Sequence, residues 1–339
     1  MKKHLETVDI LRGIAALFVL IFHFTGPVMP KIAQPLIADN TRWGRFGVEI
    51  FFVISGFIIP YVLYKTAYAL KDFGKFIGKR FIRICPPSYI IIVLTIIQYY
   101  FIERFGFSNN PWFSRLSISQ VIHNFTYTIP FTNYRWITNI FWTLAIEFQF
   151  YILLGLIYTF MFKGFKEFLL CSLIIASLYY TPLIHSLTFF EYGSLFIMGG
   201  VTLLYYNKTI SRAQFLSVLS LTGILCYFQV GWLQSTLGVL TALVIGFVNL
   251  KSSIGQFLGK ISYSLYLTHI LVGSSIEILF VKIFHPHSVG LSLLCSLIAM
   301  SIAIGFAYLF YRLFELYFID LAGKLSVRKR DKIIEQPSL

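Results

Sequence analysis

The chain has 339 residues, of which 57% are hydrophobic, 18% aromatic and only 12% charged. A soluble domain carries about 25% charged residues, so this composition excludes a soluble globular protein and indicates an integral membrane protein. The formal net charge of +14 would suggest nucleic-acid binding in a soluble chain. Basic residues retained on the cytoplasmic side of a membrane explain the charge without a nucleic-acid partner.

Ten apolar stretches approach or exceed the roughly 20 residues that a membrane-spanning helix needs. We therefore predict an all-α polytopic membrane protein of about ten transmembrane helices, with residues 1–320 as one transmembrane domain. The stretch 112–131 is too polar to span and is expected to be re-entrant or to lie at the surface. The predicted spans are residues 10–29, 46–64, 86–105, 138–162, 168–185, 189–206, 213–230, 233–250, 261–284 and 289–314.

The distribution of lysine and arginine sets the expected orientation. With the N-terminus inside, 21 of the 28 basic residues fall at inner ends and loops, and seven fall outside. Because basic residues are retained in the cytoplasm, this bias predicts that both termini are cytoplasmic, with residues 321–339 as a basic cytoplasmic tail. The outer seven are Lys31, Arg42, Arg45, Arg104, Arg115, Arg135 and Lys282.

Three ionisable residues lie along one stripe of the first predicted span. His23 follows Arg12 by eleven residues, which is about three helical turns, or roughly 16 Å along the axis. Asp9 lies three residues before Arg12 on the same stripe. Ionisable side chains inside a span are costly and are usually kept for a function, so this stripe is the first candidate for catalysis.

The loop predicted at 65–87 carries six basic residues, and Pro86 and Pro87 then open the next span. Arg80 and Arg83 are three residues apart, so a helical turn points both side chains the same way. A helix N-terminus beside two guanidiniums suits phosphate groups. The alternative is a positive-inside anchor that touches only lipid headgroups, and the spacing alone leaves both open.

Glu147 lies around the middle of the fourth predicted span, at a depth close to that of His23. A carboxylate that holds an imidazole in one tautomer is a common general-base arrangement. The alternative is a buried Glu147 that is protonated or hydrogen-bonded to a neighbouring hydroxyl group. Both interpretations stay open.

Two other spans carry small or polar residues. Ser55 and Gly56 permit close backbone approach, which fits helix packing or a narrow ligand channel. Ser262, Tyr266 and His269 follow one another at helical spacing. Such a polar stripe lines a cavity or bonds to neighbouring helices.

Arg312 and Glu315 lie three residues apart near the inner end of the last predicted span. That spacing favours a local ion pair on one helix face.

The four cysteines are far apart and include no Cys-x-x-Cys pattern. This arrangement argues against a disulfide framework or a metal cluster, and we expect no metal.

Five segments, taken in order, resemble the acyltransferase 3 family of integral membrane acyltransferases. Each motif alone is weak, but five in order on ten predicted spans are specific. The likeness runs from about residue 5 to residue 318. The segments are Asp9-Ile-Leu-Arg-Gly with His23, Phe51–Phe57, Arg80–Pro87, Phe141–Tyr151 and Ile261–His269.

The resemblance implies transfer of an acyl group, most often acetyl, from cytoplasmic acyl-CoA to a hydroxyl group of a cell-surface or lipid-linked glycan. Family substrates include lipopolysaccharide O-antigen, exopolysaccharide, peptidoglycan and lipid-linked oligosaccharides. The resemblance also implies an integral protein of the bacterial cytoplasmic membrane, with the lipid bilayer around it. The acceptor, the identity of the acyl group and the oligomeric state stay open.

Carried over by position, the resemblance makes His23 the expected catalytic residue, and Arg80 and Arg83 the pair that meets the phosphates of CoA. We expect Glu147 to orient His23 as it takes the proton from the acceptor hydroxyl, and an acyl group carried on His23 is the competing mechanism. The predicted site comprises the catalytic residues His23, Glu147 and Asp9, the acetyl-CoA-binding residues Arg12, Arg80, Arg83, Ser55, Gly56, Tyr151, Tyr266 and His269, and no metal.

A second class of function is a transporter or flippase of a lipid-linked sugar, in which His23 and Glu147 form a proton relay. It accounts for the buried ionisable residues but not for Arg80 and Arg83 at the cytoplasmic face, and it predicts movement of the acceptor without CoA. A third class is a scaffold of a glycan-assembly complex without turnover.

Overall fold

The computed structural model describes residues 2–107, 110–181, 188–284 and 288–325, and all regular elements within these ranges are helices. This confirms the predicted all-α class. The main helices are α1 (Lys2–Phe24), α2 (Pro35–Asn40), α3 (Gly47–Lys65), α4 (Phe73–Arg104), α5 (Ile118–Phe125), α6 (Trp142–Met161), α7 (Phe165–Leu178), α8 (Phe189–Tyr206), α9 (Arg212–Val230), α10 (Trp232–Phe247), α11 (Ser253–Phe284), α12 (Val289–Phe310) and α13 (Leu316–Lys324).

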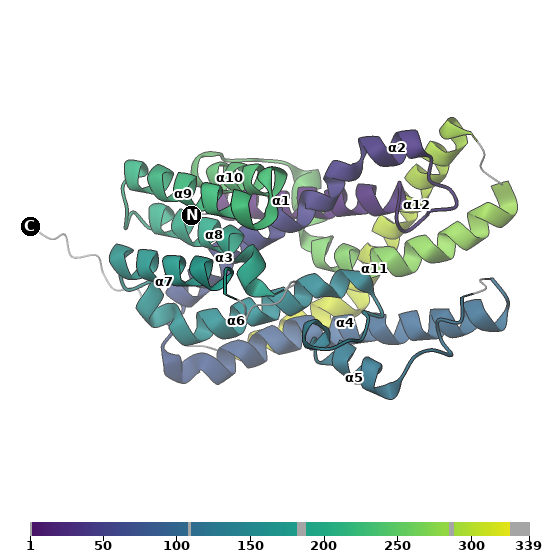
Figure 1. Cartoon of the computed structure of the whole chain (residues 1–339), viewed down its shortest axis with the longest axis horizontal. Coiled ribbons are helices and arrows are strands. Elements are labelled where there is room, and N and C mark those ends of the chain that lie inside the picture. Colours follow the sequence, from purple (N-terminus) through teal and green to yellow (C-terminus); the bar gives the residue numbers. More distant parts are fainter. Residues whose placement is uncertain (1, 108–109, 182–187, 285–287, 326–339) are drawn as a thin grey trace, which may run out of the picture.

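The helices form an elongated bundle (Figure 1). In this view α7, α8 and α9 gather toward the left end, whereas α2 and the ends of α4 and α11 extend toward the right. The predicted tail begins within α13, and its part beyond residue 325 lies outside the described residues.

Each predicted span overlaps one helix of the structure. Within the described ranges, six helical segments are long and apolar enough to cross a membrane by length and composition, which supports an integral membrane protein. The count of about ten spans and the cytoplasmic position of both termini stay predictions. The six segments are Arg42–Lys65, Leu70–Arg104, Asn139–Met161, Arg212–Val230, Ser253–Phe284 and Val289–Lys324.

In α12, which is apolar on all sides, the small residues determine which face is buried. Ala299, Ala303 and Ala307 follow at intervals of four residues and are fully buried. Leu294 and Leu297 on the other side are half-exposed, as expected of side chains that face lipid. Small residues let helices approach closely in a membrane, where lipid tails are as apolar as the helix surface.

A close helix crossing that bears on the site joins α1 to α11. A Cβ atom at Gly259 would lie 2.1 Å from the carbonyl oxygen of Asp9, and one at Gly13 would lie 2.8 Å from that of Gly255. The two helices run parallel, because the rings of His23 and His269, further along both helices, also contact each other. Glycine at this crossing therefore sets how closely the two helices approach.

The course of α4 corrects one prediction. The helix begins at Phe73 and runs through Pro86 and Pro87, so the prolines do not open it. Prolines are tolerated inside membrane helices where other groups bond to the backbone around them. Here the carbonyls freed by the missing N–H groups are those of Ile82 and Arg83. The two carbonyls directly before the prolines accept extra bonds, Cys85 O from the Ser88 hydroxyl at 2.8 Å and Ile84 O from the Tyr263 hydroxyl at 2.7 Å.

A consequence of this course is that Arg80 and Arg83 lie inside α4 and not in a loop before it. Neither residue stands at a helix N-terminus, so the predicted contribution of such a terminus to phosphate binding is wrong. Both guanidiniums lie on the same side of α4 because the two residues are three apart on one helix.

Gly259→Leu should force α1 and α11 apart, because its Cβ would overlap the backbone of Asp9. We expect a loss of about 1–3 kcal/mol of stability, seen as a lower thermal unfolding temperature in detergent. The matched control is Gly305→Leu, since a Cβ at Gly305 meets nothing within 4 Å. Equal unfolding temperatures for the two variants would contradict the tight crossing.

Candidate active site

A cavity lies where α1, α3, α4, α6 and α11 meet, with about 1030 Å³ of space not filled by atoms, part of it open to solvent. Seven of the eleven predicted site residues line it. The structure thus brings together residues that lie far apart in the sequence. These seven are Arg12, Ser55, Arg80, Arg83, Glu147, Tyr151 and Tyr266.

Three arginines face this cavity, Arg12 from α1 and Arg80 and Arg83 from α4. Arg80 is only 9% exposed, and its Nε has no hydrogen-bond partner within the described ranges. Among the residues that the structure describes, no carboxylate oxygen lies within 4.0 Å of a nitrogen of these three guanidiniums. Partly buried cations without an ion-paired partner make this end of the cavity suitable for an anion.

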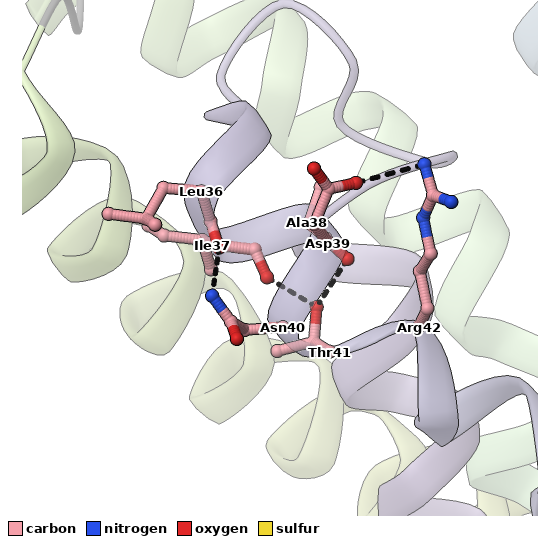
Figure 2. Close-up of polar contacts among 7 residues, drawn as sticks. All are labelled: Leu36, Ile37, Ala38, Asp39, Asn40, Thr41 and Arg42. Atoms are coloured by element: carbon pink, nitrogen blue, oxygen red, sulfur yellow. Dashed lines mark hydrogen bonds and ion pairs between the residues drawn. The ribbon is translucent and has the colours of Figure 1, made fainter.

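An arginine at the surface provides the contrast. Figure 2 shows Arg42, just beyond α2, whose guanidinium pairs with the carboxylate of Asp39 at 2.9 Å. Both side chains are largely exposed there, where such a pair contributes little to stability.

Glu147 lies at the arginine end of the cavity. Its Oε1 accepts a hydrogen bond from the Ser55 hydroxyl at 2.9 Å and another from the hydroxyl of Tyr151. The Arg80 guanidinium lies 5.6 Å from the centre of the Tyr151 ring. The carboxylate is therefore bonded to neighbouring hydroxyl groups, which is the second of the two interpretations left open by the sequence.

His23 is oriented by the backbone of its own helix. Its Nδ1 lies 2.8 Å from the carbonyl oxygen of Val19. A carbonyl oxygen only accepts, so Nδ1 donates, and Nε2 of the neutral imidazole carries the lone pair. Within the described residues, no hydrogen bond joins His23 to Glu147.

His269 repeats this arrangement on α11. Its Nδ1 donates to Tyr266 O at 2.8 Å, and its buried Nε2 has no hydrogen-bond partner in the described part of the chain. The rings of His23 and His269 are 4.8 Å apart between centroids. The Tyr266 hydroxyl, which lines the cavity, bonds to Thr143 at 2.7 Å. Tyr266 thus lies between the cavity and the histidine pair, since its ring also contacts that of His269.

Four of the eleven predicted residues do not line the cavity: His23 and His269, whose rings lie beyond Tyr266, and Gly56 and Asp9. A Cβ atom at Gly56 would lie 2.1 Å from Phe196 O, so Gly56 belongs to the crossing of α3 with α8. Asp9 is half-buried near the start of α1, with its backbone against Gly259 and within electrostatic reach of Arg12. Neither residue appears among those that line the cavity.

The predicted ion pair of Arg312 with Glu315 is wrong. Arg312 is exposed, whereas Glu315 is only 2% exposed and accepts a hydrogen bond from the Ser264 hydroxyl at 2.5 Å. The cause is the π-helical turn η5 (Tyr311–Glu315), which changes the register so that residues three apart no longer share a face. The sequence therefore did not indicate that Glu315 turns inward to Ser264, two residues from Ser262 of the cavity lining.

The family model of the acyltransferase 3 group, described as an acyltransferase domain, matches residues 5–312. The chain belongs to this family of acyltransferases.

Among curated proteins, the chain is similar to the peptidoglycan O-acetyltransferase OatA of Listeria monocytogenes, with 29% identity over 173 residues, covering 45% of this chain and 24% of that protein. It is 28% identical to the putative peptidoglycan O-acetyltransferase YrhL of Bacillus subtilis, over 44% of this chain and 23% of that protein. The O-acetyltransferase OatA of Staphylococcus aureus is 27% identical over 48% of this chain and 26% of its own length. The match thus spans about a quarter of each relative. No solved structure matches the chain significantly.

Tyr151→Phe removes one of the two hydroxyl donors to the Glu147 carboxylate. A hydrogen bond to a charged group contributes about 1.5–3 kcal/mol, so the variant should unfold at a lower temperature. Tyr227→Phe is the control, because Tyr227 is 52% exposed. If both variants unfold at the same temperature, the Tyr151 hydroxyl does not support Glu147.

Proposed function

We propose that the chain is a membrane O-acetyltransferase that moves an acetyl group from acetyl-CoA to a hydroxyl group of a glycan. The chain belongs to a family of acyltransferases. The observation that carries the proposal is its cavity, which is lined by three arginines that form no ion pair with a described residue. A polyanionic acyl donor is the substrate that such a wall favours.

The arginines would bind the phosphate groups of the donor. Arg12, Arg80 and Arg83 come from two helices, so they surround the cavity from more than one side. Guanidinium groups bind phosphate oxygens through paired, charge-assisted hydrogen bonds. The acyl end of the donor would then extend past Ser55 and Glu147 toward Tyr266, the residue that leads to the histidine pair.

His23 would act as general base. Its Nε2 takes the proton from the acceptor hydroxyl while the hydroxyl oxygen attacks the thioester carbonyl. The carbon–sulfur bond then breaks, and the imidazolium returns the proton to the departing CoA thiolate. A covalent route through an acyl group on His23 is the alternative mechanism.

The acceptor is proposed to be a glycan of the bacterial cell surface or its lipid-linked precursor. Two of the similar proteins carry the name peptidoglycan O-acetyltransferase, one of them as a putative assignment. In this proposal the chain lies in the bacterial cytoplasmic membrane, with acetyl-CoA on the cytoplasmic side.

His23→Ala should abolish transfer, because it removes the proposed base. We expect a fall in turnover of at least about 100-fold, measured as transfer from radiolabelled acetyl-CoA to glycan fragments by the purified protein in detergent. His123→Ala is the matched control, since His123 lies on α5 and bonds to Thr128. Near-normal transfer by a folded His23→Ala protein would exclude both mechanisms.

Arg83→Gln should weaken donor binding about tenfold, because it removes one charge-assisted contact with phosphate. The measurement is the dissociation constant of CoA by calorimetry at two salt concentrations. Arg212→Gln is the control, since the Arg212 guanidinium packs 5.0 Å from the centre of the Phe247 ring. A folded wild-type protein that binds no CoA would favour the transporter reading.

A further inference from the structure

Glu315 is a buried carboxylate next to the arginine wall of the cavity. It ends the π-helical turn η5, between α12 and α13, and is 2% exposed. Its Oε2 accepts a hydrogen bond from the hydroxyl of Ser264 on α11 at 2.5 Å. Two residues close to Ser264 on the same helix, Ser262 and Tyr263, line the cavity.

The negative charge of Glu315 acts on two of the three cavity arginines. Ser264, which holds Glu315, follows Tyr263, whose hydroxyl donates to the carbonyl oxygen of Ile84 at 2.7 Å. Ile84 is next to Arg83 on α4, and Arg12 lines the same cavity, so Glu315 lies within electrostatic reach of both arginines. Neither guanidinium has a nitrogen within 4.0 Å of its carboxylate, as judged over the ranges that the structure describes. The carboxylate thus lowers the positive potential of the arginine pair without occupying the hydrogen-bond donors of either residue.

The Ser264 hydroxyl explains why the carboxylate stays at this distance. It gives one oxygen of Glu315 a short hydrogen bond on the side of α11. Without that bond, the carboxylate would gain most by turning toward Arg12 or Arg83, because attraction between opposite charges is strong where water is scarce. Turns of π-helix are rare and occur frequently at functional sites.

We propose that Glu315 is a positioning residue that competes with the donor phosphates for Arg12 and Arg83 and so promotes release of CoA. This inference rests on the proposed function. A cluster of three arginines without an opposing charge would hold a polyanion tightly, and product release often limits turnover. The charge of Glu315 weakens the attraction between the arginines and CoA. The hydrogen bond from Ser264 keeps the Glu315 carboxylate from pairing directly with the arginines.

The test is the dissociation constant of CoA for the purified full chain in detergent. Glu315→Gln keeps an acceptor for Ser264 but removes the charge, so we expect CoA to bind about threefold to tenfold more tightly. Ser264→Ala frees the carboxylate to pair with the arginines, so we expect binding to weaken by a similar factor. The double variant Glu315→Gln with Ser264→Ala should bind CoA as tightly as Glu315→Gln alone, because the side chain at position 315 then carries no charge that could pair with the arginines.

Kinetics separate this role from a structural one. Glu315→Gln should lower both KM for acetyl-CoA and kcat, because the donor binds more tightly and the product leaves more slowly. Glu277→Gln is the control, because Glu277 is a buried carboxylate on α11 that accepts from the backbone N–H of Lys31 at 2.6 Å and does not line the cavity. This control should leave the dissociation constant of CoA unchanged.

The binding measurements distinguish failure of the proposed role of Glu315 from failure of the proposed function. Wild-type binding of CoA together with unchanged or weaker binding by Glu315→Gln overturns the role of Glu315 alone. A folded wild-type protein that binds no CoA overturns the proposed function and this inference with it. If Glu315→Gln does not fold, Ser264→Ala carries the test, and unchanged or tighter binding by that variant overturns the proposal.

Discussion

The parallel crossing of α1 and α11 is the constraint on which the candidate site depends. One helix carries Arg12 and His23, and the other carries Ser264, Tyr266 and His269. Because Gly259 lets the backbones approach to within a van der Waals contact, their side chains meet in a fixed register from the arginine wall to the histidine pair. The proposed anion-binding end and the proposed proton-accepting end thus lie along two helices that pack directly against each other.

Near the cavity, the carboxylates of Glu147 and Glu315 are hydrogen-bonded to hydroxyl groups, and neither forms an ion pair with another described residue. Glu147 is held by Ser55 and Tyr151, and Glu315 is held by Ser264. Burial of an ion pair costs desolvation of both charges, and a paired arginine would have fewer donors left for a substrate. Carboxylates satisfied by hydroxyls leave the guanidiniums available while still lowering the net charge around them.

The sequence predicted the helical class, the approximate helix positions and seven of the residues that line the cavity, because apolar length and the order of the motifs carry that information. It failed where backbone geometry departs from an ideal helix. A regular helix places Arg312 and Glu315 on one face, but a π-helical turn separates them, and no residue type announces such a turn. Prolines often indicate a helix start, but α4 continues through Pro86 and Pro87 because its packing against neighbouring helices holds it together, and the sequence does not show that packing. The sequence also left open whether Glu147 bonds to His23 or to a hydroxyl group. The answer depends on which side of α6 faces Ser55, and this is visible only in the packed helices.

The tautomers of His23 and His269 limit how many protons this pair of rings can hold. Both Nδ1 atoms donate to helix carbonyls, so each ring offers one accepting nitrogen. Once either ring is protonated, its positive charge lies in contact with the other ring, and like charges oppose a second protonation. A second proton on the pair would therefore place two positive charges in contact. The proposed acyl transfer would need room for one proton only, the one that passes from the acceptor hydroxyl to the departing thiolate.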